Sequence, residues 1–188
     1  MDNRTKILKS SLELFALRGY EAVGVQEIAL ASEITKPTIY HYFGNKIGLL
    51  DTLLKEYNAD FFDKLNKEAD YQGDLPLTLF RLTKAYFNFA KKEKIFYKMQ
   101  LSFLFAPEAS DTMKAIKPIY NKQFQIIEEV FVKAGFNHGN MRGKHRIYAS
   151  TFIGMINTYI NLFLMDELEL DDETIYKAVH QFSHGIYS

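Results

Sequence analysis

Three side chains that can read DNA bases occur within one run of six residues, at Lys36, Thr38 and His41. A lysine can donate hydrogen bonds to guanine, a threonine can bond either kind of base pair, and a histidine ring offers a further donor. Thr35 and Pro37 mark the start of a short helix, because a threonine hydroxyl caps backbone N–H groups and proline costs nothing in a first turn. The pattern predicts a rigid helix whose first turn enters the major groove.

Neighbouring residues fit contacts to the DNA backbone. Tyr40, Tyr42 and Lys46 offer hydroxyl and ammonium groups, which are common partners of phosphate oxygens. The full set of expected DNA contacts is Gln26, Thr35, Lys36, Pro37, Thr38, Tyr40, His41, Tyr42 and Lys46. The alternative is that Tyr40, Tyr42 and Phe43 only form the core of a three-helix unit with no nucleic-acid role.

A helix-turn-helix would position these side chains. Apolar residues at helical spacing indicate one helix over 4–18, ended by Gly19, and two short helices over 25–32 and 36–42. The tight turn Glu33-Ile34-Thr35 joins the two short helices. Their expected core consists of Ile28, Ala29, Ile34, Ile39 and Phe43.

The rest of the chain also shows helical periodicity, and no run alternates apolar and polar residues as a strand would. Asn45 is placed to cap a long helix that reaches about Glu68. Further helices are expected over 77–92, 94–105, 110–134, 142–165 and 172–186. We therefore predict an all-α protein with an N-terminal three-helix DNA-binding domain at 1–46 and a C-terminal helical effector-binding and dimerisation domain at 47–188.

Composition limits the classes of protein that the chain could be. It has 188 residues, 47% of them hydrophobic, so it can bury a core and is not expected to be disordered. It contains no cysteine, which excludes disulfides and thiolate chemistry. The net charge is zero, and six basic against five acidic side chains in the first 48 residues provide little general attraction to DNA.

Two observations bear on location. The first residues lack the apolar stretch of a signal peptide, so we expect a cytoplasmic protein. The segment 147–165 has no charged side chain and approaches the length of a membrane span. Its polar residues, such as Thr151 and Asn157, would each need a partner in lipid, so we favour a helix buried on two faces and expect no membrane partner.

The helix-turn-helix carries one long and specific motif, the run TKPTIYHYFGNK from Thr35 to Lys46. This run, with the residues around it, resembles the TetR family of transcription regulators over about the first 55 residues. The other matching residues are Phe15, Gly19, Tyr20, Ile28, Ala29, Leu49 and Leu50. The resemblance implies a homodimer with a variable C-terminal ligand domain, and repression as the usual mode of action.

The chain departs from the pattern of that family at three positions. Gly24 replaces the usual hydroxyl residue at the start of the first short helix, and Glu33 replaces the usual turn glycine. A left-handed conformation at Glu33 would be strained. Ile47 replaces a common acidic residue, which removes a favourable charge from a helix N-terminus.

The segment between Phe80 and Phe131 is rich in aromatic residues, which is typical of a tunnel for a flat or long apolar ligand. The expected effector pocket comprises Tyr86, Phe89, Phe96, Met99, Phe103, Tyr120, Phe124 and Asn157. Buried tyrosine hydroxyls and Gln123 or Asn157 would supply its polar contacts. The alternative for each of these residues is ordinary core packing.

The last two helices are expected to form the dimer. Apolar residues recur along both of them at helical spacing, and such a two-fold interface would place two recognition helices about 34 Å apart on a near-palindromic operator. The expected interface residues are Phe152, Ile156, Phe163, Ile175, Val179, Phe182 and Ile186. His180 and His184 have metal-ligand spacing, but no carboxylate accompanies them, so we expect no metal and no cofactor.

The features of the sequence fit three classes of function to different degrees. A ligand-responsive DNA-binding regulator fits best, with double-stranded DNA, a second copy of the chain and a small effector as partners. An enzyme is disfavoured because the sequence shows no phosphate loop, nucleophile elbow or other catalytic constellation, and no catalytic residue is assigned. The third class is a ligand-binding or scaffolding dimer that no longer binds DNA tightly, which Gly24 and Glu33 favour.

Overall fold

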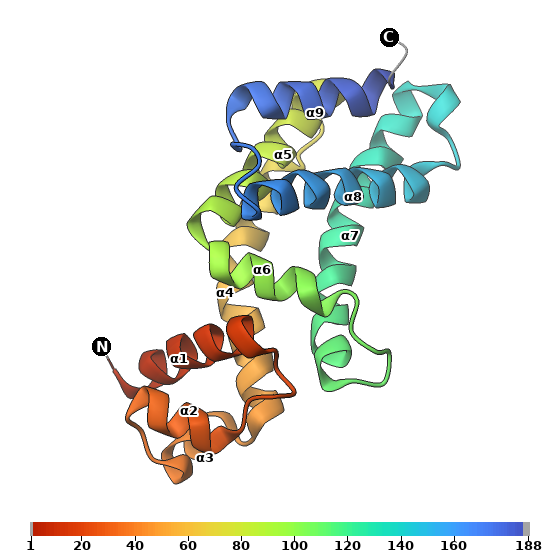
Figure 1. The fold of residues 1–188 in the computed structure, drawn as a ribbon. Coiled ribbons are helices and arrows are strands. Elements are labelled where there is room, and N and C mark those ends of the chain that lie inside the picture. Colours follow the sequence, from red (N-terminus) through yellow and green to blue (C-terminus); the bar gives the residue numbers. More distant parts are fainter. Residues whose placement is uncertain (1, 186–188) are drawn as a thin grey trace. The chain divides into compact units, whose positions relative to one another are not determined.

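The computed structural model describes residues 2–185, and within them all regular structure is helical. The all-α prediction is therefore confirmed for this part of the chain. Figure 1 shows the order of the elements. They are α1 (Asn3–Arg18), α2 (Val25–Ser32), α3 (Lys36–Phe43), α4 (Lys46–Glu68), α5 (Leu75–Lys92), α6 (Lys94–Phe103), α7 (Asp111–Asn137), the 3-10 turn η1 (Gly139–Met141), α8 (His145–Leu164) and α9 (Asp172–His184).

Contacts between residues divide the chain into two compact units. The first unit contains the residues up to Ala59 together with Ile95–Ile119, and the second contains Asp60–Lys94 and the residues from Tyr120 onward. Helices α4 and α7 therefore contribute to both units. The two units are defined by contacts and not by function. The expected division into a DNA-binding domain at 1–46 and an effector-binding and dimerisation domain at 47–188 therefore stays a prediction.

The first unit is built around the three N-terminal helices. Apolar residues three and four positions apart give each helix a buried stripe, and Ile7, Ile28 and Ile39 have no exposed surface. Helix α1 ends at Gly19, where φ is +80°. Tyr20 follows directly, and its ring lies edge-on to the ring of Phe15, with 5.1 Å between the ring centroids.

The turn of the helix-turn-helix has left-handed backbone geometry at Glu33, with φ 57° and ψ 33°. This conformation lets the Ile34 N–H donate to the Ala29 carbonyl at 3.0 Å, which closes α2 and redirects the chain into α3. A residue with a Cβ is strained there, whereas glycine is not. The strain expected from the sequence is therefore present.

Within the same unit, α4 and α6 are joined by a polar and an aromatic contact. Asn58 is fully buried, and its Nδ2 donates to the Leu54 carbonyl and to Gln100 Oε1, each at 2.8 Å. Tyr57, the residue before Asn58, stacks on Phe96 with 4.7 Å between the ring centroids. A buried amide pair is costly unless both partners are present, so it fixes the register between the two helices.

The second unit has a core of aromatic rings. Phe61 of α4 stacks on Phe89 of α5 at 4.3 Å and meets Tyr86 edge-on at 4.9 Å. A separate group joins α7, α8 and α9, because Phe152 lies 6.1 Å from Phe131 and 5.3 Å from Phe182. Rings of this size bury large apolar areas, and their edge-on pairs add specific geometry.

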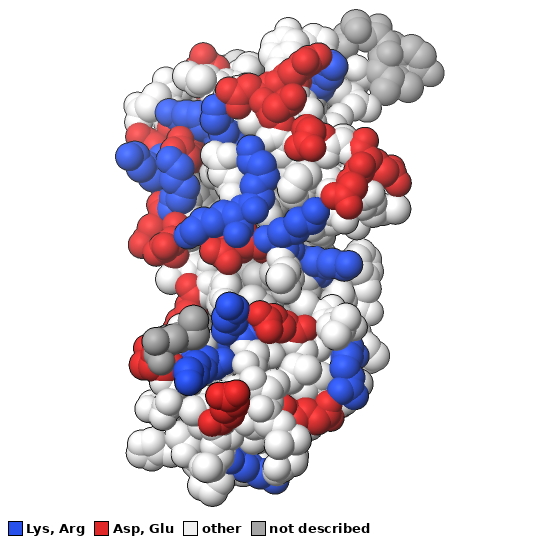
Figure 2. Space-filling model, turned by 60° about the vertical axis from the view of Figure 1, so that its left-hand side comes forward, with Lys and Arg blue, Asp and Glu red and all other residues white. Residues whose placement is uncertain are grey.

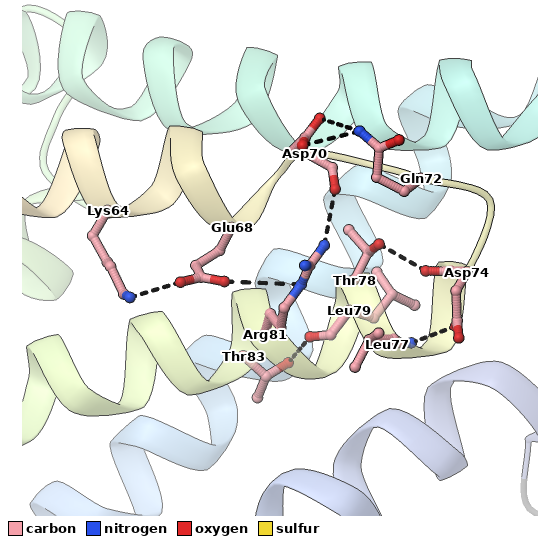
Figure 3. A network of polar contacts seen from close by, with 10 residues as sticks. All are labelled: Lys64, Glu68, Asp70, Gln72, Asp74, Leu77, Thr78, Leu79, Arg81 and Thr83. Atoms are coloured by element: carbon pink, nitrogen blue, oxygen red, sulfur yellow. Dashed lines mark hydrogen bonds and ion pairs between the residues drawn. The ribbon is translucent and has the colours of Figure 1, made fainter.

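The connection between α4 and α5 is held by side chains rather than by regular structure (Figure 3). The Arg81 guanidinium donates to the Asp70 carbonyl at 2.8 Å and lies 3.8 Å from the Glu68 carboxylate, which also pairs with Lys64. Asp74 accepts from the Leu77 N–H at 2.9 Å and so caps α5. This cap starts α5 at Leu75, two residues before the expected position 77.

The run 91–94, with three lysines and one glutamate, forms the junction between α5 and α6. In the structure Lys91 donates to the Leu170 carbonyl at 2.9 Å, and Lys94 pairs with Asp166 at 3.0 Å. Lys84 adds a pair with Asp172 at 2.8 Å. These lysines tie α5 and its end to the segment between α8 and α9. In Figure 2, basic and acidic groups stand side by side on one face in this manner.

The bounds of α7 and α8 also differ from expectation. Helix α7 runs without interruption through Pro118, although proline removes one backbone hydrogen bond, and it ends at Asn137 rather than at 134. Helix α8 begins at His145 rather than at 142, because η1 and a left-handed Gly143 precede it. The remaining bounds agree to within three residues.

Helix α8 is the one helix among residues 2–185 that is long and apolar enough to cross a membrane by length and composition. These two properties are weak criteria, because the core helix of a water-soluble domain also meets them. In the second unit α8 buries Ala149, Phe152, Ile153, Ile156 and Ile160 against its neighbours. Its apolar character is thus used at least in part for internal packing.

Replacing Glu33 by glycine should stabilise the protein. The left-handed backbone costs about 1 kcal/mol for a residue with a Cβ and very little for glycine, partly offset by the extra freedom of glycine in the unfolded chain. We expect Glu33→Gly to raise the free energy of unfolding in urea by about 0.5 to 1 kcal/mol. Glu33→Ala is the control, because it removes the carboxylate and keeps the strain; an equal gain from alanine would contradict the backbone explanation.

Candidate nucleic-acid interface

Helix α3 starts as the sequence predicts. The Thr35 hydroxyl accepts from the Thr38 N–H at 3.4 Å and lies 2.8 Å from the Thr38 hydroxyl. Pro37 occupies the first turn, where it removes no hydrogen bond. The helix ends at Gly44, and Asn45 then caps α4 by accepting from the Gly48 N–H at 2.8 Å. Thr35 at its start and Gly44 at its end therefore cap this short helix.

The two faces of α3 differ sharply in exposure. Ile39 and Phe43 are buried, whereas Lys36, Pro37, Tyr40, His41 and Tyr42 are exposed and Thr38 is half-buried. Tyr40 and Tyr42 keep 40% and 43% of their surface, so they are not core residues of the chain. Gln26 is exposed on α2. The expected base-reading and phosphate-facing side chains of α2 and α3 are thus exposed or half-buried.

The Lys36 ammonium lies 5.6 Å from the Tyr40 ring centroid, and the rings of His41 and Tyr42 lie 5.6 Å apart. These contacts hold the exposed groups loosely, because a cation near an exposed ring gains only about 0.5 to 1 kcal/mol. The side chains remain able to turn toward a bound partner. We refer to the exposed residues Gln26, Lys36, Thr38, Tyr40, His41 and Tyr42 as the reading face.

The start of α2 is held by charge instead of by a hydroxyl. The Gly24 N–H donates to Glu27 Oε1 at 3.3 Å, and the other oxygen of Glu27 pairs with Arg18. This arrangement stabilises the helix start that Gly24 itself cannot cap. It also places a carboxylate where a hydroxyl residue would offer a phosphate contact.

Lys46 contacts the interior of its own domain. Its Nζ donates to the Tyr20 carbonyl oxygen at 2.6 Å and lies 4.0 Å from the centre of the Tyr20 ring. Burial lowers the pKa of Lys46, against the opposing effect of the carboxylates of Glu21, Asp111 and Glu27. Burial also raises the pKa of Tyr20 to about 12. The ammonium therefore joins the end of α1 to the start of α4.

Two arginines near the reading face are also engaged. Arg4 pairs with Glu56 of α4, and Arg18 pairs with Glu27 of α2. With Lys46 directed at a carbonyl, half of the six basic side chains in the first 48 residues serve the fold. The sequence alone did not reveal these roles, because the partners lie far away along the chain or are backbone atoms.

The residues expected to form an effector pocket lie in both units. Phe96, Met99 and Phe103 of α6 are buried in the first unit. In the second unit Tyr86 and Phe89 are buried, and Tyr120, Phe124 and Asn157 are partly exposed. The Tyr86 hydroxyl and the Gln123 Nε2 are buried without a hydrogen-bond partner among the described residues. Burial raises the pKa of Tyr86 well above that of an ordinary tyrosine, so its hydroxyl stays a donor.

The residues expected at the dimer interface are mostly inside the protomer. Phe152, Ile156, Ile175 and Val179 are buried within the second unit, Phe163 and Phe182 are half-buried, and Ile186 lies outside the described residues. A side chain without exposed surface gains no contact area from a partner. The exposed side of α8 is a different stripe, at alternating spacings of four and three. It consists of Ile147, Thr151, Gly154, Thr158, Asn161 and Met165.

Helix α9 also presents an exposed row, formed by Tyr176, His180 and His184. The rings of His180 and His184 lie 4.6 Å apart. No group of three or more potential ligands that could hold a metal occurs among residues 2–185. The signal in the sequence that could have found these exposed rows is the set of helix positions opposite each apolar stripe.

Comparison with known proteins agrees with this geometry. The model of the family described as "Bacterial regulatory proteins, tetR family" matches residues 7–53, which include most of α1, all of α2 and α3 and the start of α4. The HTH-type transcriptional regulator YuxN of Bacillus subtilis is 34% identical over 121 residues, which cover 63% of this chain and 41% of that protein. YerO of the same organism is 28% identical over 181 residues, which cover 93% and 61%. The chain thus spans about two fifths to three fifths of these relatives.

Solved structures share the whole fold. The transcriptional regulator FadR from Bacillus subtilis, in complex with stearoyl-CoA, has a TM-score of 0.80 at 19% identity, with 97% of this chain and 99% of that chain covered. AibR, in complex with isovaleryl coenzyme A and operator DNA, has a TM-score of 0.70 at 23% identity, with 96% and 97% covered. At these identities the likeness shows the fold alone. Residues 7–53 match the DNA-binding region of the TetR family of bacterial regulatory proteins, and the chain has the fold of solved regulators of that family.

Proposed function

We propose that this regulator binds a near-palindromic operator as a homodimer and represses transcription until a small, largely apolar or aromatic effector releases it. The observation that carries the proposal is the reading face. Its side chains are exposed on a helix whose start is fixed by Thr35 and whose other side is buried through Ile39 and Phe43. A capped, rigid helix with such side chains suits direct contact with base edges.

The dimer face of the proposal is the exposed stripe of α8 together with the exposed row of α9. Small residues such as Gly154 and Thr158 allow two helices to approach closely, and Ile147, Met165 and Tyr176 add apolar area, each being more than half exposed. A two-fold arrangement would pair each stripe with its own copy. Two reading faces about one turn of DNA apart, roughly 34 Å, would then require an operator with two similar halves.

The effector of the proposal is an acyl compound or a similarly apolar molecule. The buried and unpaired Tyr86 hydroxyl and Gln123 amide support this, because an unsatisfied buried polar group costs about 1 to 3 kcal/mol and a ligand oxygen would relieve that cost. Two solved structures with this fold hold acyl derivatives of coenzyme A. Release of DNA requires only that the effector bind one dimer geometry better than another.

A second function has specific support, namely a ligand-binding or scaffolding dimer that no longer binds DNA tightly. Lys46 bonds the Tyr20 carbonyl, and Arg4 and Arg18 pair with carboxylates, so few cations remain for phosphates. Each lost phosphate contact reduces both the affinity and its dependence on salt. The two functions therefore differ in a measurable quantity.

Binding to DNA and its salt dependence test the proposed function. We expect the purified chain to select fragments from its source genome that contain two similar half-sites. The logarithm of the affinity should fall linearly with the logarithm of salt concentration. A protein that retains no sequence-selective fragment at low salt would be a scaffolding dimer, and the proposal would be rejected.

Two lysine variants should separate reading from positioning on such a fragment. Lys46→Met should lower the free energy of unfolding by about 1 to 3 kcal/mol, because the Tyr20 carbonyl loses a charged donor and keeps only the Val23 N–H at 3.3 Å, and should leave the salt slope unchanged. Lys36→Ala should leave stability unchanged, weaken binding by about 1 to 3 kcal/mol and relax the preference at one base pair. A salt slope reduced by about 1 in Lys46→Met with normal stability would identify Lys46 as a phosphate contact instead.

A charge placed on the exposed stripe of α8 should break the dimer. A Cβ at Gly154 would meet no atom within 4 Å, and glutamate is a better helix former than glycine, so Gly154→Glu should leave the protomer folded. Burying that charge at an interface should weaken dimerisation by at least about 3 kcal/mol, measured by sedimentation. Asn121→Glu, on the exposed side of α7, is the matched control. Unchanged association of the Gly154 variant would remove α8 from the dimer face.

Tyr86→Phe should make the ligand-free protein more stable. The change removes a buried hydroxyl that has no partner, so we expect the free energy of unfolding to rise by about 1 kcal/mol. The same variant should show a smaller rise in melting temperature with stearoyl-CoA than the parent chain. Tyr176→Phe, at an exposed position, is the control for both measurements. A loss of stability in Tyr86→Phe would mean that the hydroxyl already has a partner.

A further inference from the structure

A cavity of about 700 Å³ lies in the second unit beside the connection between α7 and α8. Its wall is mainly apolar and includes Leu79 of α5, Phe131 of α7 and Phe182 of α9. Tyr148 and Asn140 supply polar atoms at its border. The volume falls in the range of small-molecule sites, roughly 300 to 1,000 Å³. None of the eight residues expected to form the effector pocket lines this cavity.

A second cavity of about 450 Å³ lies next to the first. Phe131 and Met141 line both cavities, so the two spaces meet at these side chains. The second cavity has a different character, because Arg142 and His145 lie in its wall. Phe136 also lines it and is 75% exposed, which is unusual for a ring unless something covers it.

The connection that borders both cavities lies in a long stretch of the chain without acidic side chains. No aspartate or glutamate occurs from Val130 to Met165, although the whole chain has zero net charge. Within the described residues, Lys133, Arg142 and Lys144 form no ion pair with a carboxylate. Glu128 of α7 lies 3.5 Å from the Nε2 of His145. Unpaired cations at the edge of an apolar cavity attract an anion whose remaining part is apolar.

We propose that the α7–α8 connection binds an amphiphilic anion, namely an alkyl or acyl chain that carries a phosphate-bearing head group. The chain fills the 700 Å³ cavity, and the head group lies in the adjoining cavity against Arg142. Arginine is suited to this role because its planar guanidinium bonds two phosphate oxygens at once. The proposal concerns ligand binding alone and is tested without DNA, so its failure would leave the proposed operator binding untouched.

The test uses calorimetric titration of the full chain with single-chain probes below their micelle concentration. Decyl phosphate should bind one site per chain, about fifteenfold more tightly than octyl phosphate, because each of the two additional buried methylenes contributes about fourfold in affinity. Inorganic phosphate, 1-decanol and decyltrimethylammonium should each bind at least about tenfold more weakly than decyl phosphate. Equal binding of the cationic and anionic decyl probes would overturn the proposal.

Variants test the position of each part. Arg142→Gln should weaken decyl phosphate about tenfold and leave 1-decanol unchanged, whereas Ser183→Trp, at an exposed residue of the cavity wall, should weaken both. Asn140→Trp is a second blocking variant should Ser183→Trp fail to fold. Lys67→Gln and Lys67→Trp, at an exposed residue of α4, are the matched controls. The proposal is overturned when Arg142→Gln binds decyl phosphate as tightly as the parent chain does. It is also overturned when Ser183→Trp and Asn140→Trp are both folded and bind decyl phosphate as tightly as the parent chain.

Two natural sources share this chemistry, acyl derivatives of coenzyme A and lysophospholipids. Decanoyl-CoA and decanoyl lysophosphatidic acid carry the same chain on different phosphate-bearing heads. Tighter binding of decanoyl-CoA than of the lysophospholipid identifies a nucleotide head group, for which the exposed Phe136 ring offers a stacking surface. The opposite order identifies the lipid head group. Failure of both to bind, with decyl phosphate bound, would reject the natural class.

Discussion

The hydrogen bond from the Lys46 ammonium to the Tyr20 carbonyl is the contact on which the first unit depends. A partly buried ammonium is costly unless it is paired, and the Tyr20 carbonyl beyond the end of α1 otherwise accepts only from the Val23 N–H at 3.3 Å. The bond pairs the ammonium and gives the carbonyl a second donor, and the Tyr20 ring lies 4.0 Å from the cation. Because Tyr20 also packs on Phe15, the end of α1 and the start of α4 are fixed on either side of the helix-turn-helix.

These internal contacts use basic side chains, which are also the side chains that bind DNA phosphates. A domain with six basic groups in its first 48 residues uses Arg4, Arg18 and Lys46 for internal contacts. The reading face must then act through a few well-placed groups, such as Lys36 and the two exposed tyrosines, rather than through a strong positive field. The left-handed Glu33 adds strain to the same small domain. Stability and recognition are therefore closely linked in its α2 to α3 segment.

The second unit is rich in apolar and aromatic side chains, and its core does not satisfy every buried polar group. Stacked rings such as Phe61 and Phe89 pack tightly, while Tyr86 and Gln123 keep buried polar atoms without partners. Cavities remain beside the α7–α8 connection, and Ile147 and Met165 are exposed at the two ends of the outer stripe of α8. Natural cores satisfy most buried polar groups, so these exceptions are the places where ligands and a second chain would contribute.

The sequence by itself determined the helices, their caps and the reading face, because helical spacing, Thr35, Pro37, Gly19 and Asn45 act through neighbours only a few residues away. Tertiary structure alone decided which cations face outward, since the partners of Arg4 and Lys46 lie 52 and 26 residues away along the chain. It also decided which side of α8 is exposed. An apolar stripe shows that a helix is buried, but not whether its own chain or a partner buries it, and here Phe152 and Ile156 belong to the protomer.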